Sequence, residues 1–391
     1  MGILANTTSI CQFRVVGDAD VRDLITGAGD RLAARGFRSI DHCADELSVG
    51  WVQIDDAKES GFEIESSYRR DHYLTFTLRR DQRRLPPALL RAHLEMAEHE
   101  FLAANPSLQR VPKQKKEELR EAVRCSLLAK TLPSPAIYDV VWDTRSGLVT
   151  LASLNPKVVE LFETLFKQTF EGLRLVSVHP YARAEKVGGE TLASALQQAN
   201  RSTTDAVLDQ IRENGWLGRD FLLWLMFRTM NGSSEYAVNQ DGPAPADEPF
   251  VAYLNDRLVL LGHGDSGVQK ITVAGPQDNF SEVRTALQNG KDIVEAILCF
   301  EKAEHAWRLT LKGETFHFAA FKSPAVKLEK DDLTGAGSEK EALFYERMYV
   351  LEEGLQLFDS LFAAFLAERL GEGWSAEAGR IGAWLAESES T

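Results

Sequence analysis

The chain has 391 residues, 44% hydrophobic and 26% charged, and these ordinary globular values exclude a wholly disordered, collagen-like or membrane-spanning chain. Its 44 Lys and Arg against 58 Asp and Glu give a net charge of −14, which at first argues against a nucleic-acid partner. A domain size of about 150 residues predicts two or three domains, whose cores need neither disulfides nor structural metal.

The cysteines and the apolar segments indicate the compartment. No two cysteines form a C-x-x-C, and they are scattered at Cys11, Cys43, Cys125 and Cys299, so we expect a reducing cytoplasm. No Lys or Arg precedes Arg14 and no long apolar run follows it, so we expect neither a signal peptide nor a membrane anchor. The most apolar segment, 221–227, is a third of a membrane span and predicts a buried element.

The first 80 residues alternate strand-like and helix-like patterns. The apolar run 12–16 predicts a strand, and Asp20 as N-cap opens a helix that ends near Gly36. Segments 49–54 and 73–78 are rich in β-branched and aromatic residues, which favours two further strands.

Residues 86–129 have the pattern of a helical hairpin. Pro86 and Pro87 suit the first turn of a helix, and Asn105-Pro106 ends it. The second helix runs from about Lys113 to Ala129. The apolar stripes of the two helices are Leu90, Leu94, Ala97 and Phe101, and Leu119, Val123 and Leu127.

Strand and helix patterns then alternate again. Segments 137–142 and 148–152 flank a glycine-containing turn and predict a β-hairpin. A helix over 156–172 and a strand over 173–178 follow. Because hairpins are too frequent for a purely parallel sheet, we predict an α+β fold with mixed or antiparallel sheets and a protruding helical hairpin.

The second half of the chain has a different order of loops, strands and helices. Residues 239–249 form a Pro-rich acidic linker, and 251–321 are β-rich. Ser338 and Glu341 form a capping box that opens a long helix ending near Leu370. The predicted domains are 1–80 with 131–185, a basic hairpin 81–130, an insertion or linker 186–250, a β-rich domain with its closing helix 251–370, and a weak acidic tail 371–391.

Motifs for catalysis or cofactor binding are weak. The run 262–267 matches G-x-G-x-x-G and contains Gly-Asp-Ser-Gly, but the strand-like 268–273 follows it, which favours a hairpin turn over a dinucleotide site or a protease loop. His93 and His99 lie six residues apart, on opposite faces of a helix. We therefore expect no cofactor and no metal ligands.

The distribution of charge is more informative than its total. Residues 79–130 hold 12 basic and 7 acidic side chains, an excess of five. Lys113, Lys116, Arg120 and Arg124 form one row on the second helix, and long cations in a row can follow phosphates without reading bases. Alternatively this is a solvated face, since Glu117 and Glu121 partly neutralise the row and it borders the apolar stripe.

Tryptophans could serve as stacking platforms for bases, but each lies in an apolar run, which favours core packing. They are Trp51, Trp142, Trp216, Trp224 and Trp307.

Several segments occur in the order seen in one known family. They are Val49-Gly50-Trp51-Val52, the run 84–90 (RLPPALL), the Lys-rich 113–120, Trp142-Asp143 followed by Gly147-Leu148, and 290–294 (GKDIV). On these residues the chain resembles the recombination-associated protein RdgC family, most strongly over 49–155. Departures are the greater length, the extra sequence around 180–250, and a single Lys270 where relatives have consecutive lysines.

The resemblance implies a non-enzymatic DNA-binding protein of the bacterial nucleoid, in the cytoplasm. It implies α+β horseshoes that pair as a homodimer into a ring, enclose duplex DNA with little sequence preference, and restrain the recombinase RecA. It also implies that Leu132 helps to close the ring. We predict DNA contacts from Arg79, Arg80, Arg83, Arg84, Lys113, Lys115, Lys116, Arg120, Arg124 and Lys130. Family basic positions match at Arg80, Arg84, Lys113, Lys116 and Arg120.

Two other function classes stay open. Some members of that family carry an exonuclease label, and a metal-dependent nuclease would use Asp139, Asp143 or the cluster 329–332 for Mg²⁺. A protein-interaction scaffold would use the helix 338–370 and no DNA. No membrane partner is expected.

Overall fold

The computed structural model describes residues 2–19, 21–43, 45–264, 267–275, 280–326 and 336–386. This described part contains eleven α-helices and thirteen strands, so the α+β prediction is confirmed. The chain divides into two compact units. Unit 1 comprises Met1–Val16, Arg145–Glu160 and Arg174–Thr391, and unit 2 comprises Gly17–Thr144 and Leu161–Leu173.

The sheet of unit 2 is built on one long pair of strands. Strand β4 (Tyr73–Gln82) lies between β2 (Leu47–Val52) and β5 (Ser134–Asp143), antiparallel to both. The short β3 (Arg69–Arg70) pairs with the start of β4. The β4–β5 ladder runs without a slip from Tyr73 opposite Asp143 to Gln82 opposite Ser134. The residues between Gln82 and Ser134 are therefore an insertion at the open end of this ladder.

Aromatic side chains form the core of unit 2. Trp51 on β2 packs edge-on to Phe162, with ring centroids 6.2 Å apart, and Trp142 on β5 packs on Phe166 at 5.6 Å. Both phenylalanines come from α5 (Pro156–Thr169), and the indole N–H of Trp51 donates to the hydroxyl of Thr169 at 2.8 Å. These indoles are buried, as are Trp216, Trp224 and Trp307 in unit 1, so core packing of the tryptophans is confirmed.

The single helix predicted over 20–36 is wrong. It is divided at Gly27 into α1 (Val21–Thr26) and α2 (Ala28–Ala34). Gly27 has φ −96° and ψ 19°, outside the helical region, and that local bend starts the second helix. The proposed N-cap Asp20 lies outside the described residues. A 3₁₀ turn, η1 (Glu65–Ser67), precedes β3.

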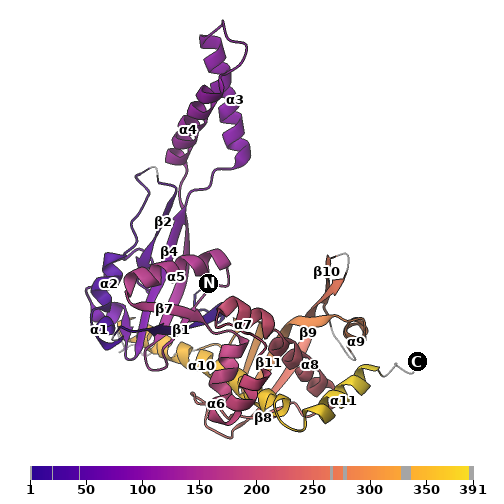
Figure 1. The fold of residues 1–391 in the computed structure, drawn as a ribbon. Helices are drawn as coiled ribbons and strands as arrows, with labels where there is room; N and C mark the ends of the chain where they lie inside the picture. Colours follow the sequence, from indigo (N-terminus) through magenta and orange to yellow (C-terminus); the bar gives the residue numbers. More distant parts are fainter. Residues whose placement is uncertain are drawn as a thin grey trace. The chain divides into compact units, whose positions relative to one another are not determined.

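The predicted helical hairpin is confirmed. Helices α3 (Pro87–Ala104) and α4 (Lys113–Lys130) run side by side away from the β4–β5 ends (Figure 1). Pro86 and Pro112 occupy the N-cap positions, where a missing N–H removes no helical hydrogen bond. All of α3 is described and none of its side chains is buried, while α4 buries only Leu127 and Leu128, at its base. Most of the hairpin therefore lies in solvent.

Unit 1 contains an open antiparallel sheet. Its strand order is β10-β9-β11-β12-β13-β1-β6, with β7 beside β1 and β8 beside β9. The hairpin turn predicted between β9 and β10 is confirmed by their antiparallel register, with Gly264 opposite Gly267; Asp265 and Ser266 lie outside the described residues. The strands are β1 (Thr7–Gly17), β6 (Leu148–Leu151), β7 (Leu173–Ser177), β8 (Glu235–Ala237), β9 (Pro249–Gly264), β10 (Gly267–Val273), β11 (Asp292–Lys302), β12 (His305–Lys312) and β13 (His317–Lys322).

Six helices accompany the unit 1 sheet. The region 186–250, expected as an insertion or linker, supplies most of α6 and all of α7 and α8, and α8 buries the apolar run 221–227. The helices are α6 (Pro180–Ala199), α7 (Val207–Glu213), α8 (Trp216–Asn231), α9 (Ser281–Gln288), α10 (Ala336–Arg369) and α11 (Trp374–Ala386).

Two details of the C-terminal prediction are corrected. Ser338 lies inside α10 instead of capping it, because the helix already includes Ala336. Residues 374–386, expected as a weak tail, form α11, which buries Ile381 and Trp384. An amphipathic packing face outweighs the acidic composition of this segment. No described helix is both long enough and apolar enough to cross a membrane.

Candidate nucleic-acid interface

The base of the hairpin is fixed by Arg83. This side chain is 1% exposed, and its guanidinium donates to the backbone carbonyls of Ile40 (2.8 Å), Asp41 (3.3 Å), Cys43 and Asp45 (3.2 Å). Four carbonyl acceptors on one guanidinium clamp the 40–45 loop against the start of the insertion. Arg83, predicted as a DNA contact, is therefore a structural residue, and we leave it out of the interface.

Arg79 is also engaged within the fold. It donates to both carboxylate oxygens of Asp81 at 2.9 and 2.7 Å and to the carbonyl of Ala57 at 2.8 Å. Its guanidinium lies 4.2 Å from the ring centre of Phe37. The hydrogen bonds to Asp81 raise the pKa of Arg79 further. Its charge is neutralised locally and three of its five N–H donors are engaged within the fold, so this second predicted contact is less suited to bind a phosphate.

Arg80 and Arg84 converge on one neutral acceptor. Arg80 donates to the side-chain oxygen of Gln82, and the Nε of Arg84 lies 3.3 Å from the same oxygen. The Nε of Arg80 is buried without a hydrogen-bond partner among the described residues. Two guanidinium groups are thus close together with no carboxylate between them, an arrangement that favours an incoming anion.

On α4, three of the predicted cations are paired with carboxylates. Lys115 contacts Glu118 at 2.9 Å and Lys116 contacts Glu98 of α3 at 2.8 Å. Arg124 pairs with Glu46. Because these pairs are exposed, each is weak and exchanges readily with solvent ions. The solvated-face alternative therefore holds for part of the row.

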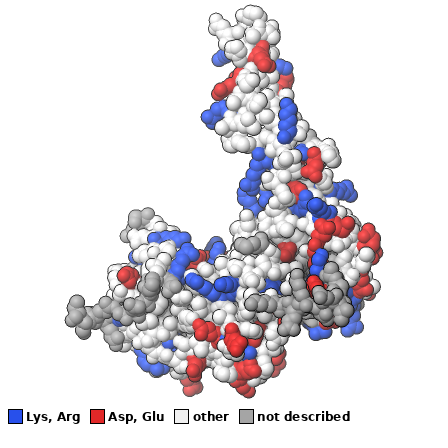
Figure 2. Space-filling view, turned by 180° about the vertical axis from the view of Figure 1, so that it is seen from behind, with Lys and Arg blue, Asp and Glu red and all other residues white. Residues whose placement is uncertain are grey.

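Three predicted cations are unpaired in the described part of the chain. Lys113, Arg120 and Lys130 are exposed and have no side-chain hydrogen bond or ion pair to any described residue. Arg91 and Arg110, which lie off the predicted row, share this property on the same hairpin. Figure 2 shows Lys and Arg side chains along the hairpin and gathered near its lower end.

Apolar side chains are exposed beside these cations. Leu132, in the segment that joins α4 to β5, is 84% exposed, and Met96 on α3 is 58% exposed. Leu89 and Ile137, at the base of the hairpin, are 40% and 45% exposed. The hairpin and its base therefore also expose apolar surface to water, which is unfavourable in free energy.

The candidate carboxylates for a nuclease do not meet. Asp139 and Asp143 both lie on β5, four residues and therefore about 13 Å apart along the strand. Asp139 is 7% exposed and accepts from the Thr77 hydroxyl at 2.9 Å. Among the described residues no three His, Cys, Asp or Glu side chains are placed to hold a metal ion. The cluster 329–332 lies outside the described residues.

Comparison with protein families connects this architecture to known proteins. Residues 13–215 match the family model described as "Putative exonuclease, RdgC". The chain belongs to the RdgC family. The resemblance predicted from the sequence is confirmed at the level of the family.

The RdgC match includes all of the helical hairpin and ends at the start of α8, so the sheet from β9 to β13 and helices α9 to α11 lie outside it. No curated protein matches the chain.

Sequence reasoning missed two parts of this surface. Arg91 and Arg110 add to the unpaired charge, and their signal was present in the basic excess of 79–130. The role of Gln82 as the shared acceptor of Arg80 and Arg84 had no sequence signal, since an isolated glutamine at a strand end is common.

Proposed function

We propose that this RdgC-family protein binds duplex DNA through its helical hairpin, by contacts to phosphates that are independent of sequence. The observation that carries the proposal is the set of exposed cations without carboxylate partners on α4, with two more at the hairpin base. Its members are Arg80, Arg84, Lys113, Arg120 and Lys130.

The spacing of these cations suits a phosphate backbone. Lys113 and Arg120 are seven residues apart on α4, about 10 Å along the helix axis and on the same face. Lysine and arginine on long stems follow phosphates without recognising bases. The paired Lys115, Lys116 and Arg124 contribute less, because each must first exchange a carboxylate partner for a phosphate.

The proposed assembly is a homodimeric ring around the duplex. Leu132 and Met96 give each subunit exposed apolar area for a second copy. The rest of the chain, outside residues 79–130, has a net charge of −19, which would keep other nucleic acid from adsorbing to the outer surface. On the RdgC resemblance, we propose that the bound ring resides on the cytoplasmic nucleoid and modulates homologous recombination by restraining RecA.

An exonuclease is the second candidate, favoured by the printed description of the family. It needs carboxylates that share a metal ion, and Asp139 and Asp143 are too far apart along β5 to be joint ligands. Incubation of end-labelled linear duplex with Mg²⁺ and Mn²⁺ separates the candidates. Intact DNA at saturating protein supports binding without cleavage, and steady release of nucleotides would support the exonuclease.

The test of the proposal is binding to fluorescent duplexes of unrelated sequence at several salt concentrations. Five cations that each meet a phosphate predict that log K falls against log salt with a slope of about −4.5 per subunit. Equal affinities and slopes for all sequences are expected. Flat salt dependence, or absence of binding at low salt, would contradict the proposal.

A further inference from the structure

A cavity in unit 1 is lined by no residue of the proposed DNA interface, whose residues all belong to unit 2. Its volume is about 310 Å³, at the small end of the range for ligand pockets. Strands β6 and β7 both pair with β1. The N-terminal half of α6 supplies Ala182, Glu185 and Lys186 to the cavity wall.

The interior of this cavity is apolar. Leu148, Val176 and Val178 line it from the strands, and Ala182 lines it from the helix. Leu148 is directly opposite Arg14 in the β1–β6 register, so their side chains lie on the same face of the sheet. Because Ala182 is short, the helix leaves the space above these side chains unfilled.

Two of the three charged side chains that line the cavity are cationic. Arg14 is exposed and forms no ion pair with a described residue. Lys186 contacts Asp359 at 3.1 Å and is 51% exposed, so its ammonium keeps donors for another group. Glu185 is the one acidic residue among the side chains that line the cavity.

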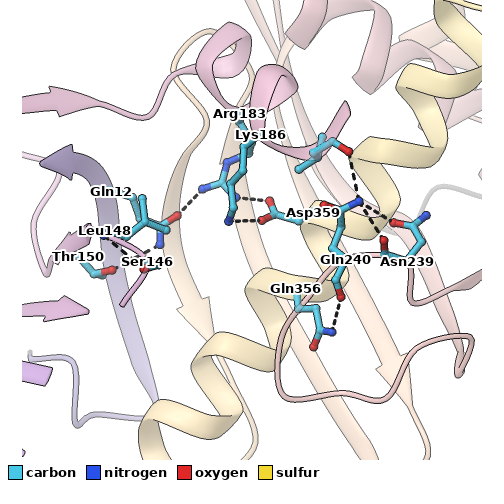
Figure 3. A network of polar contacts seen from close by, with 11 residues as sticks. Gln12, Ser146, Leu148, Thr150, Arg183, Lys186, Asn239, Gln240, Gln356 and Asp359 are labelled. Carbon is cyan, nitrogen blue, oxygen red and sulfur yellow. Dashed lines mark hydrogen bonds and ion pairs between the residues drawn. The ribbon is translucent and has the colours of Figure 1, made fainter. Parts of the chain in front are cut away.

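A network behind the rim fixes these charges (Figure 3). Asp359 accepts from both Arg183 and Lys186, and Arg183, which is 2% exposed, also donates to Gln12. One carboxylate therefore serves two cations, and its charge is not free to neutralise Arg14. The side chains at the rim and behind it are Arg14, Arg183 and Lys186, which are cationic, and Glu185 and Asp359, which are anionic.

Two further groups affect the charge near the rim, His179 and Asp205. Burial, aided by the charge of Arg14, lowers the pKa of His179 to about 4, so His179 is neutral at physiological pH. Burial raises the pKa of Glu185 and the charge of Asp205 raises it too, against the opposing effect of Arg14. Arg14 and Lys186 are thus the two cationic side chains on the cavity wall, and they suit a ligand that has a carboxylate.

We propose that this cavity binds a small monocarboxylate with a branched apolar body. The carboxylate lies between Arg14 and Lys186, and the apolar body packs on Leu148, Val176 and Val178. A free aliphatic acid and the C-terminal residue of a peptide share this chemistry. The site is independent of the proposed DNA binding, since no residue of the hairpin lines it.

The experiment measures ligand binding to the full chain by saturation-transfer NMR and isothermal titration. The probes are 4-methylpentanoate, N-acetyl-leucine, N-acetyl-leucine amide and the peptide acetyl-Ala-Ala-Leu. The acids are expected to bind about tenfold more tightly than the amide, as one charge-assisted hydrogen bond would give. Binding of the peptide indicates a C-terminal source, and binding of the free acids alone indicates a small molecule.

Matched variants locate the binding. Arg14→Gln is expected to weaken N-acetyl-leucine about tenfold, while Arg308→Gln, which removes an exposed arginine from β12, leaves its affinity unchanged. Ala182→Leu fills the cavity and abolishes binding, and Ala182→Ser keeps the space and the affinity. Near-ultraviolet circular dichroism verifies that each variant is folded. Equal affinity for acid and amide, no binding by wild type at 10 mM of any acid, or insensitivity to Arg14→Gln would overturn the proposal.

Discussion

Neutralising two unpaired cations of α4 gives the most direct test of the hairpin as a DNA interface. The variant is Lys113→Gln with Arg120→Gln, and both side chains are exposed without ion-pair partners in the described part of the chain. Neither supports packing, so the variant is expected to unfold at the same urea concentration as wild type.

The expected loss of affinity follows from counterion release. Each lost phosphate contact reduces the salt slope by about 0.9, so two contacts reduce it by about 1.8 per subunit. At 0.1 M salt this corresponds to about 1.8 decades, a weakening of about 60-fold or about 2.5 kcal/mol. If both subunits of the proposed dimer meet the same duplex, the slope falls by about 3.6.

Fluorescence anisotropy with three unrelated 30-base-pair duplexes, each titrated between 50 and 250 mM salt, measures the slope. The matched control is Lys115→Gln with Lys116→Gln, which removes the same charge from the same helix. Those lysines contact Glu118 and Glu98, so the control is expected to change the slope by less than half as much. An unchanged slope in the first variant, or a loss that depends on sequence, would refute the reasoning.

Three further predictions concern stability, each measured by urea unfolding. Arg83→Ala leaves four loop carbonyls without their donor and is expected to cost about 3 kcal/mol, with the DNA salt slope unchanged; a cost below about 0.5 kcal/mol would contradict the clamp. Gly218→Ala places a Cβ 1.9 Å from the Gly313 carbonyl oxygen and is expected to cost about 2–3 kcal/mol, whereas Gly379→Ala, with open space around it, costs none. The pKa of His179 is lowered to about 4 in the fold, so its contribution is full above about pH 6.5 and is lost as pH falls toward 4; the drop in unfolding free energy from pH 7 to 4.5 should be about 2–3 kcal/mol smaller in His179→Asn, and equal drops would exclude this role.

Long periodic segments were predictable, because one face of each must be buried. The hairpin helices, the paired β4 and β5, and the long α10 lie within a few residues of their predicted limits. The break at Gly27 and the helix α11 were not, since a local bend and an acidic but amphipathic segment are decided by tertiary packing.

The basic segment was predictable as a whole but not residue by residue. Arg83 and Arg84 are adjacent and chemically identical, yet Arg83 turns into the 40–45 loop while Arg84 remains exposed. Arg79 is likewise neutralised by Asp81, two residues away on the same strand. Composition supplies the number of cations, and only the position of each side chain relative to its neighbours separates a clamp from a ligand contact.

Because the ladder between β4 and β5 is unbroken, the length of the helical hairpin does not affect the pairing of these two strands. Gln82 and Ser134 are directly paired, so their Cα atoms are held about 5 Å apart whatever chain runs between them. The entropic cost of closing a loop grows only with the logarithm of its length. Whole helical turns can therefore be added to or removed from both helices without altering the strand register. Relatives can therefore differ in the length of this one insertion while their sheets stay the same.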